Sequence, residues 1–336
     1  MSTPPLELEL ITKKRLHLVA GRSHRELAVE VAQCLGVDLG EVNIAEFANG
    51  EIHCRFGESI RGADVFIFQG HCSSLNPDMS INDALMEQLI MVDAARRASA
   101  KRITVVAPMF GYARQDRKAE GREPITAKLV ANLLAAAGAK RLVSVDLHSG
   151  QIQGFFDGPV DHLTAMPVLI DWMSENLPDD LVVVSPDAGR VKVAERYANL
   201  LHADIAIVHK RRVRGAKNTV EAKEVVGEVE GRTCVLIDDM IDTAGTIVAA
   251  AEQLHERGAE SVYAACTHGV FSGPAIDRLK NSVISKVVTT NTLPLPPEKQ
   301  LDKIEVLSVA GIIADAIDAV FEDTSVSEIF GGANLS

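Results

Sequence analysis

Residues 235–246 read VLIDDMIDTAGT: an apolar run, two adjacent carboxylates, and a loop of small and hydroxyl residues that leads into a helical pattern at residues 247–254. Backbone N–H groups at a helix N-terminus are free to bind a phosphate group. Carboxylates placed just before them suit sugar hydroxyls or Mg²⁺. The segment therefore predicts a strand, loop and helix that hold a phosphate at the loop and a ribose at the acidic pair.

A simpler explanation is helix capping, because Asp and Thr are both ordinary capping residues. For the two carboxylates alone, capping explains the sequence as well as binding does. It explains the whole segment poorly, since a buried strand rarely ends in two adjacent carboxylates without a partner. The complete strand, acidic pair, loop and helix favour a binding site.

Strand-like and helix-like segments alternate along the rest of the chain. Gly138 and Gly258 stand where a helix C-terminus favours a left-handed residue, and a β-branched run follows each of them. The strand-like runs are continuously apolar, which indicates parallel sheets covered on both faces. Ligands are then expected beyond the carboxyl ends of the strands. The expected strands are residues 65–68, 103–106, 181–184, 205–208, 235–237 and 287–290.

The length of 336 residues favours two domains, because single hydrophobic cores usually stop growing below this size. We expect residues 1–165 to form one α/β domain, with a tail of about residues 320–336 that packs back on it. Residues 166–319 are expected to form the second domain.

Composition narrows the class of partner and the compartment. The net charge of −12 repels nucleic acid and anionic lipid, so an anion has to be bound by a local cluster of cations or backbone N–H groups. The five cysteines lack Cys-x-x-Cys spacing, so we expect neither a disulfide framework nor a zinc site. We therefore expect a cytoplasmic protein without a membrane-spanning segment.

Residues 235–246 closely resemble the phosphoribosyl pyrophosphate-binding loop of the type I phosphoribosyltransferase fold. The resemblance implies two such domains, each with a mainly parallel sheet flanked by helices. The fold includes transferases that consume phosphoribosyl pyrophosphate and the synthetase that makes it. The residues implied to bind ribose 5-phosphate are Asp238, Asp239, Asp242, Thr243, Ala244, Gly245 and Thr246.

Three further segments resemble ATP-contacting parts of the ribose-phosphate pyrophosphokinase family: residues 47–51 (FANGE), 112–118 (YARQDRK) and 146–156 (DLHSGQIQGFF). Taken alone, Phe47 would more often belong to a core, and His148 would be structural as often as a ligand. The cations of residues 112–118 would equally suit a solvated turn. The residues implied to bind ATP are Phe47, Asn49, Glu51, Arg114, Gln115 and His148.

Two segments that follow strands complete the resemblance. Residues 185–189 (SPDAG) resemble the loop that meets the pyrophosphate group, and Asp187 is implied to bind Mg²⁺ together with His148. Many family members have a second glycine where this chain has Arg190, which would add a cation facing phosphate. Residues 209–217 (HKRRVRGAK) resemble the mobile catalytic loop and imply Lys210 and Arg212 as catalytic cations. A basic run is usually solvated or binds nucleic acid, but so short a cluster in an acidic chain suits a small polyphosphate.

The resemblance extends from about residue 16 to residue 330. It implies that the β,γ-diphosphoryl group of ATP moves to the anomeric hydroxyl of ribose 5-phosphate. The products are AMP and phosphoribosyl pyrophosphate, which serves nucleotide, histidine and tryptophan biosynthesis. Mg²⁺ is the implied cofactor. A homohexamer is implied, with each ATP site completed by the Phe47 loop of a neighbouring subunit, and neither nucleic acid nor membrane is a partner.

Residues 57–62 (GESIRG) and 325–327 (SVS) resemble segments that bind regulatory phosphate or ADP in related enzymes. The resemblance implies regulation by inorganic phosphate as an activator, or by ADP. Ala119 departs from the charged residue common at its position. The candidate allosteric residues are Ser59, Arg61, Arg122, Ser325 and Ser327.

Two other functions stay open at this point. A phosphoribosyltransferase would use the loop of residues 238–246 but would not need Phe47, Arg114 or a nucleotide-binding His148. A non-catalytic regulatory protein associated with the synthetase would keep the fold, although the retained Asp187 and the other site residues argue against it.

Overall fold

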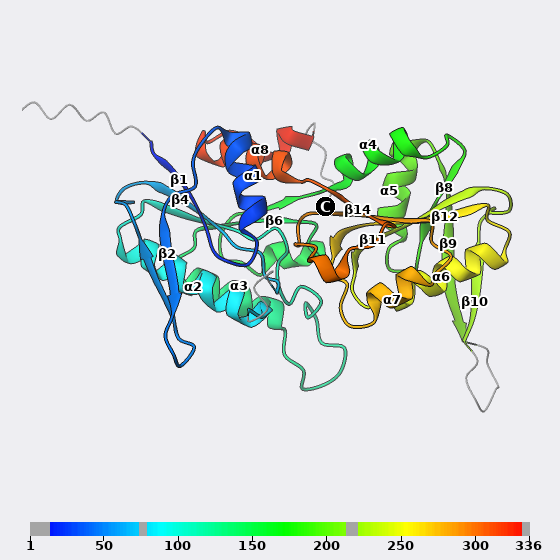
Figure 1. The fold of residues 1–336 in the computed structure, drawn as a ribbon, viewed down its shortest axis with the longest axis horizontal. Helices are drawn as coiled ribbons and strands as arrows, with labels where there is room; N and C mark the ends of the chain where they lie inside the picture. The colour runs from blue at the N-terminus through cyan, green and yellow to red at the C-terminus, as the bar shows by residue number, and fades with distance from the viewer. Residues whose placement is uncertain (1–13, 74–78, 213–220, 331–336) are drawn as a thin grey trace, which may run out of the picture.

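The computed structural model describes residues 14–73, 79–212 and 221–330, and it forms two α/β halves that lie side by side (Figure 1). Each half contains one main sheet, of five strands in the first and seven in the second. No helix in these described ranges is long and apolar enough to cross a membrane.

The first sheet is entirely parallel. Its strand order is β1-β4-β5-β6-β7, and every neighbouring pair runs in the same direction. Continuous apolar strands suit this arrangement, because both faces of the sheet are covered by helices. The strands are β1 (Leu16–Ala20), β4 (Asp64–Phe68), β5 (Arg102–Val106), β6 (Arg141–Val145) and β7 (Val160–Leu163).

Alternate residues of β4 show how the two faces are filled, since successive strand side chains point to opposite faces. Val65 and Ile67 pack with α2 (Ile81–Arg97) and α3 (Thr126–Ala137). Phe66 and Phe68 pack with α1 (Arg25–Leu35) and α8 (Ala310–Phe321). The first half is therefore a sandwich of helices, sheet and helices.

The second sheet has the order β10-β9-β8-β11-β12-β13-β14 and is parallel except for its edge strand β10. Helices α6 and α7 cover one face, and α4 and α5 cover the other. The strands are β8 (Leu181–Ser185), β9 (Asp204–Arg212), β10 (Glu221–Val226), β11 (Thr233–Ile241), β12 (Ser261–Gly269), β13 (Lys286–Thr290) and β14 (Ile304–Leu307). The helices are α4 (Met166–Asn176), α5 (Val191–Leu201), α6 (Gly245–Glu256) and α7 (Ala275–Lys280).

The predicted α/β class and the strands expected from the sequence are confirmed, and two strands are longer than expected. Strand β11 continues through the acidic pair to Ile241, and β9 continues to Arg212 because it pairs with the antiparallel strand β10. The two expected helix-ending glycines have positive φ, 133° at Gly138 and 85° at Gly258, as a left-handed residue requires. A separate antiparallel hairpin, β2 (Val42–Glu46) and β3 (Ile52–Phe56), stands beside the first sheet.

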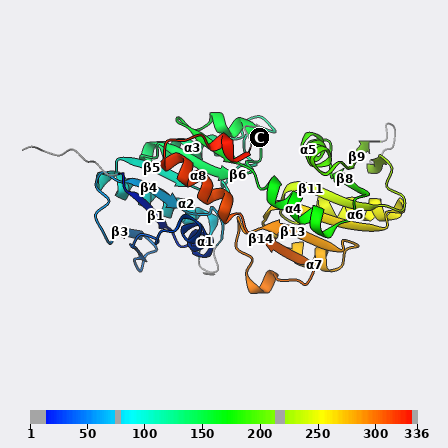
Figure 2. The same ribbon diagram turned by 90° about the horizontal axis from the view of Figure 1, so that it is seen from above.

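The chain crosses between the halves after β7 and again after β14. The second crossing leads into α8, which lies on the first half against α1 (Figure 2). Val309, Ile313 and Ile317 are buried there beside Leu27 and Val31 of α1. This packing favours a returning segment that begins near residue 309 rather than residue 320. The division of the chain after residue 165 stays a prediction.

We expect Ile313→Ala to lower the free energy of unfolding by about 2–5 kcal/mol, because it leaves a cavity where α8 packs on α1. Urea unfolding followed by circular dichroism measures the change. Leu200→Ala is the control, since Leu200 is 54% exposed on α5 and its truncation should cost no more than about 0.5 kcal/mol. Equal effects of the two substitutions would show that α8 does not hold the first half together.

Candidate active site

The segment that predicted the fold forms the centre of the site. Asp238 and Asp239 are the last polar residues before β11 ends, and Asp239 is only 9% exposed. Helix α6 begins at Gly245, after Ala244 in a left-handed conformation with φ of 59°. Such a φ is uncommon outside glycine and turns the chain sharply from strand to helix. The loop therefore presents the first backbone N–H groups of α6 next to the acidic pair.

Asp239 lies between a histidine of the first half and an arginine of the second. His148 Nδ1 donates a hydrogen bond to Asp239 Oδ2 (2.7 Å), and Arg190 Nη2 lies 2.5 Å from Asp239 Oδ1. Arg190 Nε also lies 3.2 Å from Asp238 Oδ1. Arg190 Nη2 is 2.9 Å from His148 Nδ1 as well, but a ring nitrogen that donates its proton to Asp239 has no lone pair for this contact.

The two adjacent carboxylates have opposite pKa shifts, as expected when like charges share a buried site. Burial and the neighbouring Asp239 raise the pKa of Asp238 to about 8. Burial alone would raise the pKa of Asp239 too. The hydrogen bond from His148 and the charge of Arg190 outweigh burial and lower the pKa of Asp239 to about 2. Asp239 is thus the ionised member of the pair at neutral pH.

The loop after β6 that carries His148 is hydrogen-bonded to the second half. Asp146, the first residue after β6, has a φ of 38° and accepts hydrogen bonds from the Thr267 hydroxyl (2.6 Å) and the Ala165 N–H (2.9 Å). His268 Nε2 lies 3.1 Å from the carbonyl oxygens of both Val145 and Asp146. These buried polar contacts fix the position of the His148 loop relative to the second sheet.

The segment expected to contact ATP also reaches the ribose loop. Arg114 Nη2 forms an ion pair with Asp242 Oδ2 at 2.8 Å. Both residues line a cavity of about 530 Å³ between the halves, together with Gln115, Thr243 and Lys299. Candidate residues for the nucleotide and for the sugar phosphate therefore border one cavity.

Phe47 lies apart from these groups. It follows β2 at the turn of the β2–β3 hairpin, where Asn49 Oδ1 accepts a hydrogen bond from the Glu51 N–H (3.2 Å). The Phe47 ring is 58% exposed and contacts His53 edge-on, with 6.0 Å between the ring centroids. A large aromatic ring exposed in a polar turn is available to a ligand or to another subunit.

The predicted metal ligands are not in contact with each other in the described residues. Asp187 Oδ1 accepts a hydrogen bond from the Gly189 N–H (2.7 Å), and the described residues contain no group of three or more His, Cys, Asp or Glu that could hold a metal. The donors nevertheless fit Mg²⁺, which keeps several waters and is usually held by one or two protein carboxylates plus substrate phosphates. The hydrogen bond from His148 Nδ1 to Asp239 leaves the Nε2 lone pair for a ligand, an arrangement common in metal-binding histidines.

The remaining predicted residues are scattered. Lys210 and Arg212 lie in β9, but their side chains fall outside the described part of the structure. Ser325 and Ser327 contact each other through their hydroxyls (2.8 Å). Among the described residues, no hydrogen bond or ion pair links residues 59–61 or Arg122 to this pair of serines.

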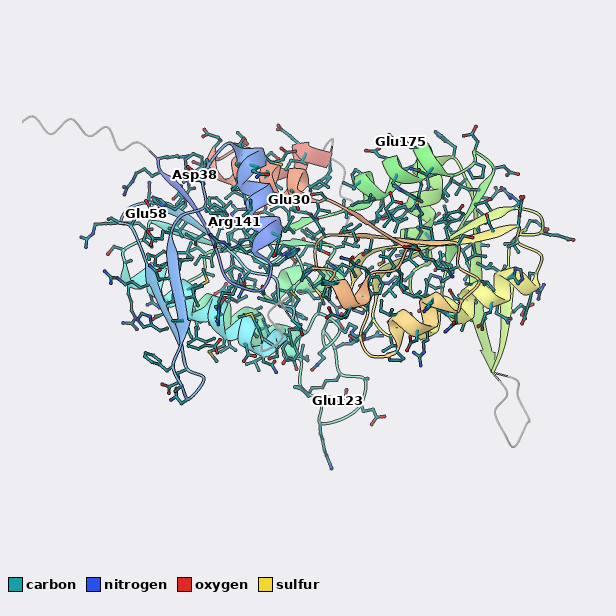
Figure 3. The ribbon with its side chains drawn as sticks, in the orientation of Figure 1. Glu30, Asp38, Glu58, Glu123, Arg141 and Glu175 are labelled. Carbon is teal, nitrogen blue, oxygen red and sulfur yellow. The ribbon has the colours of Figure 1, made fainter. Side chains whose placement is uncertain are left out.

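The loop after β5 contains two residues that the sequence analysis named, Ala119 and Arg122. Figure 3 labels Glu123 on this projecting loop. The Glu123 carboxylate accepts hydrogen bonds from the N–H groups of Ala119 (2.7 Å) and Glu120 (3.0 Å), which shape the loop near Arg122. Ala119 thus contributes its backbone to the loop.

Two cationic residues near the β11–α6 loop, Arg278 and Lys299, were not identified from the sequence. Arg278 Nη1 donates a hydrogen bond to the Thr243 carbonyl (2.9 Å), and Lys299 lines the cavity. Neither residue belongs to a recognisable motif, and both come from connections that follow other strands. Only the general rule that ligands bind beyond strand ends could have indicated them.

The fold defines a protein of the phosphoribosyltransferase-like α/β class, with the acidic pair and the start of α6 beside the cavity between its halves. The model of the N-terminal domain of ribose phosphate pyrophosphokinase matches residues 16–138, and that of the phosphoribosyl synthetase-associated domain matches residues 214–331.

The chain belongs to the ribose-phosphate pyrophosphokinase family. It is 56% identical over 319 residues to the ribose-phosphate pyrophosphokinase of Streptomyces avermitilis, with 95% of this chain and 97% of the relative covered. The Bifidobacterium longum protein of the same name is 54% identical, over 94% of this chain and 93% of that protein. The crystal structure of phosphoribosylpyrophosphate synthetase from Mycobacterium smegmatis matches with a TM-score of 0.86 and 52% identity, over 92% of this chain and 100% of that one.

We expect Asp238→Asn to stabilise the protein more at pH 8 than at pH 5. The raised pKa of Asp238 means that the folded state binds a proton more tightly than the unfolded state between about pH 4 and pH 8. Wild-type stability therefore falls as pH rises through this window, and the substitution removes that loss. The relative gain in Tm should be on the order of 3 °C by differential scanning calorimetry.

Asp323→Asn is the control for this measurement. Hydrogen bonds from Lys14 and Arg102 lower the pKa of Asp323 to about 2, so it is ionised at both pH values in the folded and unfolded states. A gain for Asp238→Asn that is the same at pH 5 and pH 8 would contradict the assigned shift.

Proposed function

We infer that this chain transfers the diphosphoryl group of ATP to ribose 5-phosphate, producing phosphoribosyl pyrophosphate and AMP. The observation that supports this most directly is the hydrogen bond from His148 to Asp239, because it joins the nucleotide-side loop of the first half to the ribose loop of the second. The ion pair between Arg114 and Asp242 repeats the same link. A site for two substrates, with their reacting ends facing each other, needs both links.

The ribose site is assigned to the β11–α6 loop. The N–H groups at residues 243–246 would bind the 5-phosphate at the start of α6, and Asp238 and Asp239 would accept hydrogen bonds from the ribose hydroxyls. In this pose the anomeric hydroxyl would face the diphosphoryl group of ATP. The hydroxyl then attacks the β-phosphorus of ATP in line, and AMP leaves.

Mg²⁺ would be held by His148 and Asp187 together with the phosphate oxygens of ATP, and when bound it neutralises charge that develops on those oxygens. The protein residues do the positioning. His148 is oriented through its hydrogen bond to Asp239, and Arg114 and Gln115 border the cavity where the nucleotide would lie. Lys210 and Arg212, carried on β9, would stabilise the phosphoryl charge in the transition state.

The remaining assignments concern the oligomeric state, regulation, cellular location and domain division. A homohexamer in which Phe47, Asn49 and Glu51 reach the ATP site of a neighbouring subunit is supported by the exposure of the Phe47 ring. Regulation by phosphate or ADP would use Ser59, Arg61, Arg122, Ser325 and Ser327. A cytoplasmic location and a division into two domains after residue 165 remain part of this proposal.

The purified protein, incubated with ATP, Mg²⁺ and ribose 5-phosphate, should form AMP and phosphoribosyl pyrophosphate in equal amounts. Lys210→Ala should lower turnover about a hundredfold or more, because it removes a cation that stabilises the transition state. Lys280→Ala, an exposed lysine on α7, is the control and should keep wild-type turnover. AMP without phosphoribosyl pyrophosphate would refute diphosphoryl transfer, and an active Lys210→Ala protein would remove Lys210 from the mechanism.

Combining two variants with different defects in one oligomer tests the shared ATP site. Phe47→Ala should raise the KM for ATP about tenfold or more, since stacking of an aromatic ring on a base contributes on the order of 1–3 kcal/mol. Co-expression of Phe47→Ala with Lys210→Ala should restore low-KM activity in part. Mixed oligomers then contain sites with Lys210 from one subunit and Phe47 from its neighbour. Absence of recovery in oligomers shown to be mixed would place Phe47 in the site of its own subunit.

A further inference from the structure

Arg190 occupies the centre of the acidic pair. It precedes α5, and its side chain is 17% exposed. Its Nε faces Asp238 and its Nη2 faces Asp239, so one guanidinium is shared by two carboxylates from adjacent positions of β11. Nη1 also donates to the His148 carbonyl at 3.4 Å. The side chain therefore contacts both the ribose loop and the His148 loop.

This geometry meets a strict electrostatic requirement. Two carboxylates at the end of a buried strand are costly unless a cation or several hydrogen-bond donors compensate them. Arg190 supplies a permanent charge and a planar fork that matches two oxygen acceptors, which a lysine would not do equally well. The guanidinium occupies Asp238 Oδ1 and Asp239 Oδ1, so a ligand that binds these carboxylate oxygens has to compete with it.

We propose that Arg190 is the resident counter-ion of the Asp238–Asp239 pair in the free protein, and that the ribose hydroxyls and a Mg²⁺ ion other than the one assigned to His148 and Asp187 bind there by displacing its guanidinium. The inference rests on the proposed function, because it concerns the same ribose site. It makes Arg190 a residue that sets the order of binding. Free Mg²⁺ binds the acidic pair weakly, whereas the sugar and its metal together compensate both carboxylates and release the arginine.

The displaced guanidinium would be free to bind phosphate oxygens of the substrates. Arg190 lies directly after the loop of residues 185–189, and arginine binds phosphate oxygens in the same bidentate manner as carboxylates. Substrate binding thus exchanges one pair of oxygen acceptors for another.

The test compares Arg190→Gly, which removes the guanidinium, with the wild type. Isothermal titration with MgCl₂, without nucleotide or sugar, should give a Kd for Mg²⁺ about tenfold lower in the variant, because the competing cation is gone. The same Mg²⁺ concentrations should raise the Tm of the variant by several degrees and that of the wild type much less.

Arg232→Gly is a matched control. Arg232 is also shared by two carboxylates, Asp180 and Asp204, and its side chain is 18% exposed, but it lies just before β11, at the opposite end of that strand from Asp238. Its loss should leave the Kd for Mg²⁺ unchanged. Arg190→Lys keeps the charge without the planar guanidinium, so its Kd for Mg²⁺ should lie between those of the wild type and Arg190→Gly. The lysine variant also provides a test if the glycine variant does not fold.

Titration with ribose 5-phosphate distinguishes failure of this inference from failure of the proposed function. Equal Mg²⁺ affinity in wild type, Arg190→Gly and Arg190→Lys, with ribose 5-phosphate binding intact, would overturn the inference and leave the proposed function standing. Wild-type protein that binds no ribose 5-phosphate at any Mg²⁺ concentration would refute the proposed function itself.

Discussion

Two adjacent carboxylates buried at the end of a parallel strand are the constraint on which the site depends. Asp238 and Asp239 cannot both be ionised there without compensation. The compensating groups come from separate connections: Arg190 from the loop after β8, and His148 from the loop after β6 of the other sheet. The complete set of compensating groups is therefore present only where the two halves meet at this edge.

The contact between the two halves contains buried polar groups. Asp146, Thr267 and His268 are linked by hydrogen bonds across it, close to the ion cluster. Buried polar networks of this kind specify one arrangement more sharply than apolar packing does, because a shifted arrangement leaves donors and acceptors unpaired. Such a contact suits a reaction whose protein contribution is mainly alignment, since small displacements of the reacting groups are costly.

The sequence predicted the parts of the structure that depend on local patterns. Apolar runs gave the strands, positive-φ glycines marked helix ends, and residues 235–246 identified the strand, loop and helix at the site. The length of β9 was missed because it depends on pairing with β10, which follows the basic run. The contacts of Arg190 with Asp238 and Asp239 were missed because the partners of a long side chain depend on which residues the fold brings near it. For the same reason, Arg278 and Lys299 gave no signal, since their role depends on loops distant in sequence.

The return of α8 to the first half has a consequence for the order in which the protein forms during synthesis. Strand β1 and helix α1 leave the ribosome early, yet the apolar surface beside Leu27 and Val31 that α8 covers stays open until residues 310–321 have been made. The sheet of the second half is already complete at β14 by then. The half that is synthesised first is thus the last to be finished. Its uncovered apolar face has to be kept from other chains until translation is almost over.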